Sequence, residues 1–119
     1  MLIKNKGLIR ILYAFRYSYQ GLSSALKNED AFRQELLLFT ALAIGSFYLE
    51  ITVVERLVII GSMLLVLIVE LLNSAIECVV DRVGVEHHIL SGRAKDYGSL
   101  AVFLSLIFSC SVWGTILLL

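Results

Sequence analysis

The placement of charged residues constrains the fold of this chain more than any other feature of its sequence. Residues 36–49, 57–69 and 97–119 contain no charged side chain, and the last of these runs covers 23 residues. A helix needs about 20 apolar residues to cross a bilayer. The chain also lacks proline and is 59% hydrophobic, which is far too apolar for a soluble domain of 119 residues. We therefore predict an all-α membrane protein, a single membrane-embedded domain over residues 1–119 with spans at about 31–52, 57–81 and 96–119.

Ahead of the first span, apolar residues recur at alternating spacings of four and three, while basic and polar side chains occupy most of the opposite side. The apolar stripe comprises Leu8, Leu12, Phe15, Tyr19, Leu22 and Leu26. This pattern predicts an amphipathic helix over about residues 5–27, lying either in the plane of the membrane surface or against a protein neighbour. Asn28 is predicted to cap the next helix, with Glu29 and Asp30 near the positive end of its dipole.

The positions of lysine and arginine predict the orientation in the membrane. Six of these ten residues precede the uncharged run at 36–49 of the first span, three lie in the second loop, and only Arg56 lies in the first loop. The positive-inside rule therefore places the N-terminus and the second loop, predicted as a polar loop over residues 81–96, in the cytoplasm. Acidic and basic residues are equal in number, so no basic surface for nucleic acid is expected.

The middle span contains polar side chains on one helical face. Glu70, Asn73, Ser74 and Glu77 occupy positions i, i+3, i+4 and i+7, and Asp81 continues the face by one turn. An ionisable side chain at membrane depth is costly and is rarely present without a partner or a function. The deeper acid is suited to accept a proton and the shallower one to hold a divalent cation. The alternative is that these residues only join helices through hydrogen bonds, but two glutamates beside an asparagine and a serine favour a catalytic role.

The sequence contains neither a P-loop nor the catalytic loop of the protein kinases. A nucleotide would therefore be bound by other means, such as magnesium held by carboxylates and phosphates, with Lys95 and Arg10 offsetting the remaining negative charge. His87 and His88, taken alone, are interpreted as exposed loop residues rather than metal ligands.

Three segments resemble one family. EDAFRQE at residues 29–35, VELLNSAIECVVDRVG at residues 69–84 and LSGRAKDYGSLAV at residues 90–102 are similar to the small integral membrane diacylglycerol kinase of Gram-negative bacteria. The resemblance extends over about residues 8–113. It implies a homotrimer of three-span subunits, each with an N-terminal surface helix, in the bacterial inner membrane. It also implies transfer of the γ-phosphoryl group of MgATP to the hydroxyl of diacylglycerol, which yields phosphatidic acid and ADP.

The resemblance also implies roles for individual residues. Glu70 would be the general base, Glu29 and Glu77 would hold Mg²⁺, and Asn73 would support that cluster. The residues implied at the ATP site are Arg10, Tyr17, Glu29, Asn73, Glu77, Glu86, His87, His88, Lys95 and Asp96. Those implied at the lipid site are Arg10, Ala14, Phe15, Arg16, Tyr17, Ser18, Tyr19, Ala31, Phe32, Arg33, Gln34, Glu35, Glu70, Ser99 and Trp113.

Two alternative functions stay open at this point. Gram-positive relatives of the same fold phosphorylate undecaprenol, although the GRAKDYGS and VEHHILSG segments favour the diacylglycerol branch. The second alternative is a noncatalytic membrane subunit or a transporter whose buried carboxylates relay protons or ions.

Overall fold

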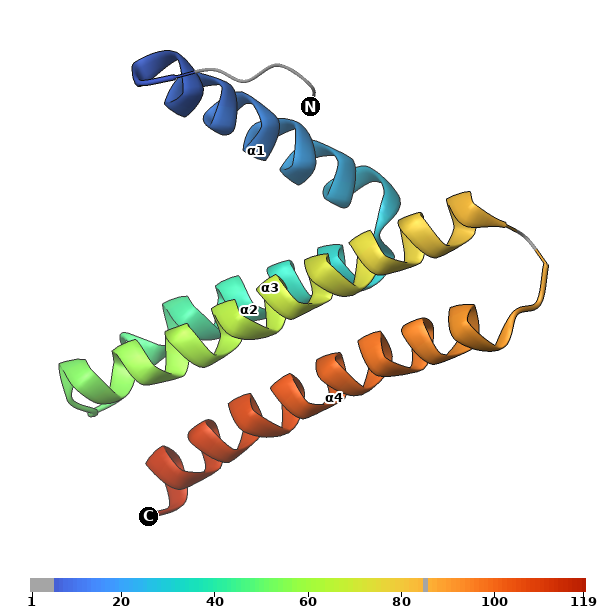
Figure 1. The fold of residues 1–119 in the computed structure, drawn as a ribbon. Helices are drawn as coiled ribbons and strands as arrows, with labels where there is room; N and C mark the ends of the chain where they lie inside the picture. The colour runs from blue at the N-terminus through green and yellow to red at the C-terminus, as the bar shows by residue number, and fades with distance from the viewer. Residues whose placement is uncertain (1–5, 85) are drawn as a thin grey trace.

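The computed structural model describes residues 6–84 and 86–119, and the prediction of an all-α chain is confirmed. Four helices follow one another: α1 (Leu8–Asn28), α2 (Asp30–Ser46), α3 (Val53–Val83) and α4 (Ile89–Leu118). Helix α3 packs most extensively against α4 and, on another side, against α2, whereas α1 contacts chiefly α2. Figure 1 shows α4 running back alongside α3 and α1 leading away from the other helices. The predicted start of the first helix at residue 5 lies outside the described residues.

Helices α3 and α4 are long and apolar enough to cross a membrane, with 31 and 30 residues. Only 33% and 11% of their most apolar segments are buried within the chain, whereas the core helix of a soluble protein is mostly buried. Helix α2 has 17 residues and is about 26 Å long at 1.5 Å per residue. It is shorter than the predicted span over residues 31–52, because the chain turns after Ser46.

The turn between α2 and α3 is held by Arg56. Its Nε donates to the Ser46 carbonyl at 3.1 Å and its Nη2 donates to the Leu49 carbonyl at 3.2 Å. The guanidinium also lies 4.9 Å from the centre of the Phe47 ring. These contacts give a partner to the carbonyl of Ser46, the last residue of α2, and to that of Leu49 in the turn. Arg56 therefore fixes the first loop, which the sequence predicted between the first two spans.

A single residue, Glu29, separates α1 from α2, and its backbone is extended (φ −113°, ψ 99°). The break itself was predicted, but Asn28 is not the cap of α2. Asn28 is the last residue of α1, and its Nδ2 donates to the Ser24 hydroxyl at 3.2 Å. Arg33 joins the two helices, since its Nη1 donates to the Leu26 carbonyl at 2.8 Å while its Nη2 pairs with Asp30.

The prediction of a polar loop over residues 81–96 is wrong for most of its length. Helix α3 continues to Val83, and α4 already begins at Ile89. His88 caps α4, because its Nδ1 accepts a hydrogen bond from the Leu90 backbone N–H at 3.0 Å. Both helices thus extend past their apolar segments, so a change from apolar to polar residues does not mark the end of either helix.

One face of α3 is buried along most of its length. It consists of Ile59, Ser62, Met63, Val66, Glu70 and Asn73, so Glu70 and Asn73 continue the stripe of core residues. The surface of α4 that faces it is formed by small residues, since Gly98, Ser105 and Ser109 are buried there. Small residues allow membrane helices to approach closely. The hydroxyls of Ser62 and Ser109 lie 3.0 Å apart and join the two helices by a buried hydrogen bond.

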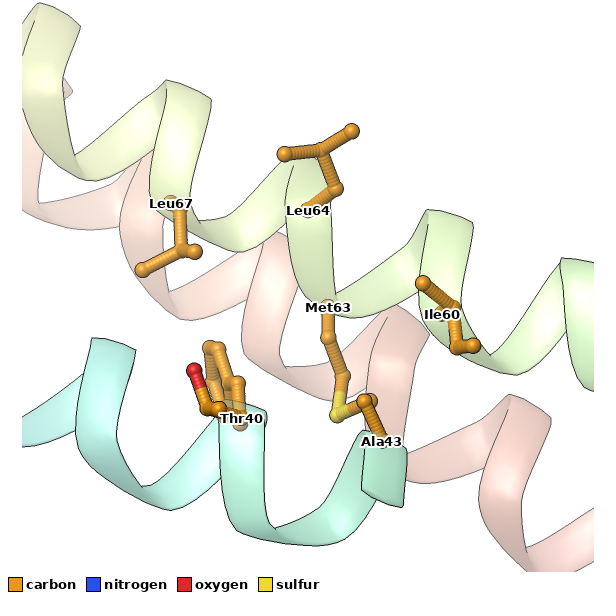
Figure 2. A pocket seen from close by; sticks show the side chains of 7 residues that line it. Thr40, Ala43, Ile60, Met63, Leu64 and Leu67 are labelled. Carbon is orange, nitrogen blue, oxygen red and sulfur yellow. The ribbon is translucent and has the colours of Figure 1, made fainter. Parts of the chain in front are cut away.

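The contact between α2 and α3 leaves an apolar groove of about 140 Å³. In Figure 2, Met63 and Leu67 point toward α2, where Ala43 and Thr40 lie, whereas Leu64 points away from it. The core is otherwise small: the buried hydrophobic residues are Ala25, Phe32, Ile59, Met63 and Val66. Much of the apolar surface of α3 and α4 therefore stays uncovered by this chain alone.

Candidate active site

Glu70 and Asn73 are the buried polar residues at the centre of the candidate site. Each is 8% exposed, on the face of α3 that packs against its neighbours. Both follow from helical periodicity, since they lie four and seven residues beyond the core residue Val66. Ser74 is half-buried, while Glu77 and Asp81 are exposed. The predicted polar face is therefore present, and it changes from buried to open along the last turns of α3.

Asn73 connects the buried part of this face to the open part. Its Nδ2 donates to Glu77 Oε1 at 2.9 Å, within the same helix. The hydrogen bond fixes one carboxylate oxygen of Glu77. The hypothesis that this face only joins helices receives no support from Asn73, because its bond stays within α3.

Three further carboxylates lie around Glu70. Glu35 on α2 approaches Glu70 closely enough to hydrogen-bond if one of the two is protonated, and its Oε2 is buried without another partner. The negative charges of Glu77 and of Glu29, at the junction of α1 and α2, also act on Glu70. Glu35, Glu77 and Glu29 thus add negative charge to the surroundings of Glu70. Such a concentration of negative charge favours a proton or a cation at this position.

The described residues contain no metal site built by protein side chains alone. Within residues 6–84 and 86–119, no three acidic, histidine or cysteine side chains are close enough to hold a metal ion together. Magnesium in phosphoryl-transfer sites takes one or two carboxylates and fills its other positions with phosphate oxygens and water. Glu77 and Glu29 are the two carboxylates that the sequence predicted for such an ion.

A polar pocket of about 250 Å³ lies at the turn between α3 and α4. Four of the residues predicted at the ATP site line it, namely Glu86, His87, His88 and Lys95. Lys95 Nζ also pairs with Asp81 Oδ1 at 2.8 Å, so in this structure its charge is matched by a carboxylate. Asp96 is exposed and does not line the pocket. The structure therefore gathers most of the predicted loop residues around one cavity.

The pocket also contains residues that sequence reasoning missed. Ser91 and Gly92 lie on the first turn of α4, and Val80 and Gly84 lie at the end of α3. The signal that would have identified Ser91 is its spacing from Lys95, four residues along a helix. It was missed because these residues were assigned to a loop.

The remaining predicted residues are not brought together. Arg10, Tyr17 and the neighbouring residues of α1 are exposed, and Tyr17 stacks on Tyr13 within its own helix at a centroid distance of 6.1 Å. Ser99 and Trp113 are about 21 Å apart along α4 at 1.5 Å per residue. Arg33 bonds to the end of α1, as described above. These assignments stay predictions.

Comparisons with known proteins agree with the resemblance. The family described as Prokaryotic diacylglycerol kinase matches residues 16–117. A diacylglycerol kinase of Haemophilus influenzae is 52% identical over 114 residues, covering 96% of this chain and 97% of the relative. Those of Pseudomonas aeruginosa and Escherichia coli K12 are 51% and 47% identical, covering 94% and 93% of this chain and 91% of each relative.

Proposed function

Since the chain belongs to the prokaryotic diacylglycerol kinase family, we propose that it transfers the γ-phosphoryl group of ATP to the hydroxyl of diacylglycerol. The products are phosphatidic acid and ADP. The observation that carries this proposal is the pair Glu70 and Glu77 on one face of α3, one acid buried and the other open, with Asn73 between them. The names of the relatives favour diacylglycerol over undecaprenol as the acceptor.

In this mechanism, Glu70 accepts the proton of the lipid hydroxyl while the hydroxyl oxygen attacks the γ-phosphorus and ADP leaves. Phosphoryl transfer requires alignment and charge neutralisation more than covalent chemistry, so one positioned base is enough on the protein side. Burial of Glu70 supports this role, because it keeps water, the competing acceptor, away from the base.

Glu77 and Glu29 would hold Mg²⁺ against the ATP phosphates, and Asn73 would fix the carboxylate of Glu77. When bound, the ion neutralises charge on the phosphates. The polar pocket at the α3–α4 turn would receive the nucleotide, with Lys95 exchanging its partner Asp81 for a phosphate. Glu86, His87, His88 and Asp96 would complete this side, and Arg10 and Tyr17 would approach from α1.

The lipid would lie near the junction of α1 and α2, where α2 packs on α3. Its hydroxyl must reach Glu70, which Glu35 on α2 also approaches. The rest of the proposed lipid site comprises Ala14, Phe15, Arg16, Ser18, Tyr19, Ala31, Phe32, Arg33, Gln34, Ser99 and Trp113.

We also propose the membrane arrangement of a three-span subunit in the bacterial inner membrane, with the N-terminus in the cytoplasm. The distribution of lysine and arginine supports this orientation. Helix α1 would lie on the membrane surface, since Leu8, Leu12, Phe15 and Tyr19 are 68–78% exposed. A homotrimer is proposed from the resemblance, and neighbouring subunits would help to enclose the acids of α3.

The decisive experiment measures phosphoryl transfer by the purified protein in detergent micelles with ATP and Mg²⁺. Diacylglycerol and undecaprenol are offered separately, and product is followed by ³²P transfer into the lipid fraction. We expect phosphatidic acid from diacylglycerol. Faster transfer to undecaprenol would replace the substrate assignment, and no transfer to either lipid would favour the noncatalytic alternative.

A further inference from the structure

Asn73 of α3 packs directly against Gly98 of α4. Gly98 is buried, and a Cβ atom built on it would lie 2.0 Å from Asn73 Oδ1 and 3.1 Å from Asn73 Cγ. Real Cβ atoms essentially never approach another atom within 3.0 Å. The other glycines of α4, Gly92 and Gly114, would have no atom within 4 Å of an added Cβ. Only position 98 on this helix therefore depends on the absence of a side chain.

The atom that occupies this space is itself unusual. Asn73 Oδ1 is buried and has no hydrogen-bond partner among the described residues. The oxygen lies against the bare backbone of Gly98, and the amide nitrogen at the other end of the same group donates to Glu77 Oε1 at 2.9 Å. An unpaired buried oxygen costs free energy. The amide nevertheless holds this orientation, which is the one that directs its nitrogen toward Glu77.

We propose that Gly98 is a positioning residue of the phosphoryl-transfer site, which acts through Asn73 on the carboxylate of Glu77. The inference rests on the proposed function, in which Glu77 holds the cation that accompanies ATP. A side chain at position 98 would push the Asn73 amide out of its place between the helices. Glu77 would then lose the donor that fixes one of its oxygens, and the cation would bind to a carboxylate with more freedom.

The test compares Gly98→Ala with Gly114→Ala, the same substitution on the same helix at a position with open space. Alanine is the better helix former, so neither variant is expected to weaken α4 through its intrinsic propensity. Binding of Mn²⁺ in the presence of a non-hydrolysable ATP analogue is measured by electron paramagnetic resonance on the detergent-solubilised protein. We expect about a tenfold weaker Mn²⁺ affinity for Gly98→Ala, the usual cost of losing the partner of a metal ligand. Gly114→Ala should bind as the wild type does. Wild-type affinity in Gly98→Ala would overturn the proposal.

A double-mutant cycle with Asn73→Ala distinguishes positioning from a general effect on packing. If Gly98 acts through Asn73, adding Gly98→Ala to Asn73→Ala should change Mn²⁺ affinity by less than about twofold. The reason is that the Asn73 amide, which a side chain at position 98 would displace, is already absent. Effects that multiply in the double variant would refute the inference. If Gly98→Ala alone does not fold, the double variant with Asn73→Ala is still expected to fold. If the double variant also fails to fold, the alanine at position 98 collides with a residue other than Asn73, which would refute the inference.

The outcome is separable from that of the proposed function. Mn²⁺ binding with the analogue requires neither lipid nor turnover. A wild-type protein without phosphoryl transfer to diacylglycerol, but with coupled Gly98 and Asn73 effects on Mn²⁺ binding, would refute the reaction and keep the positioning role. A wild-type protein that phosphorylates diacylglycerol, but whose Gly98→Ala and Asn73→Ala effects on Mn²⁺ affinity simply multiply, would keep the reaction and refute the positioning role.

Discussion

Replacing Asn73 by alanine tests the link between the buried and open parts of the site. The variant removes the amide that donates to Glu77 Oε1 at 2.9 Å. A hydrogen bond to a charged group contributes about 1.5–3 kcal/mol. Asn73 is 8% exposed, but Glu77 is exposed, so water can take the place of the lost donor. The lower end of that range applies, about 1.5 kcal/mol, which is roughly tenfold in a binding constant.

The assay follows lipid phosphorylation at constant ATP while free Mg²⁺ is varied in detergent micelles. We expect the Mg²⁺ concentration for half-maximal rate to rise about tenfold in Asn73→Ala, with a smaller loss of rate at saturating Mg²⁺. Ser62→Ala is the matched control, because Ser62 is also a buried polar residue on the same face of α3. An unchanged Mg²⁺ requirement combined with a lower maximal rate would refute the reasoning. Asn73 would then act on the reacting groups directly.

Further outcomes follow from the same geometry. Glu70→Gln should lower kcat by about 10²–10⁴-fold. Its thermal stability in detergent should equal or exceed that of the wild type, since one of several neighbouring negative charges is removed. Near-normal turnover would exclude Glu70 as the general base. Lys95→Ala should raise the KM for MgATP severalfold, and Lys95→Arg should restore it, whereas an unchanged KM in the alanine variant would show that the nucleotide binds elsewhere. Thr52→Ala, which removes the capping box of α3, should lower the free energy of unfolding by about 1 kcal/mol, measured by denaturant titration in micelles. Ser62→Ala should cost about 0.6 kcal/mol in the same titration and leave kcat unchanged.

The sequence was sufficient to predict the helices and the polar face of α3, because both depend on local periodicity. Glu70 and Asn73 repeat at the spacing of the core residues Ile59, Met63 and Val66, so their burial could be predicted from the chain alone. The same reasoning placed the break near Glu29, where charged residues replace apolar ones.

Helix ends were less predictable, because they depend on contacts that spacing does not reveal. Arg56 ends α2 by reaching back ten residues to Ser46. His88 starts α4 by accepting a hydrogen bond from Leu90, although its polar neighbours suggested a loop. The pairing of Lys95 with Asp81 and the approach of Gly98 to Asn73 join two helices, so neither could be derived from one helical face.

Only Glu29 separates α1 from α2, so the chain is intolerant of length changes at this position. One inserted residue beside Glu29 would rotate everything before it by about 100° relative to α2 if the added residue were helical. The Leu26 carbonyl would then move out of reach of Arg33, which now bonds it at 2.8 Å. Homologous chains should therefore vary in length before α1 or between the later helices rather than at this junction.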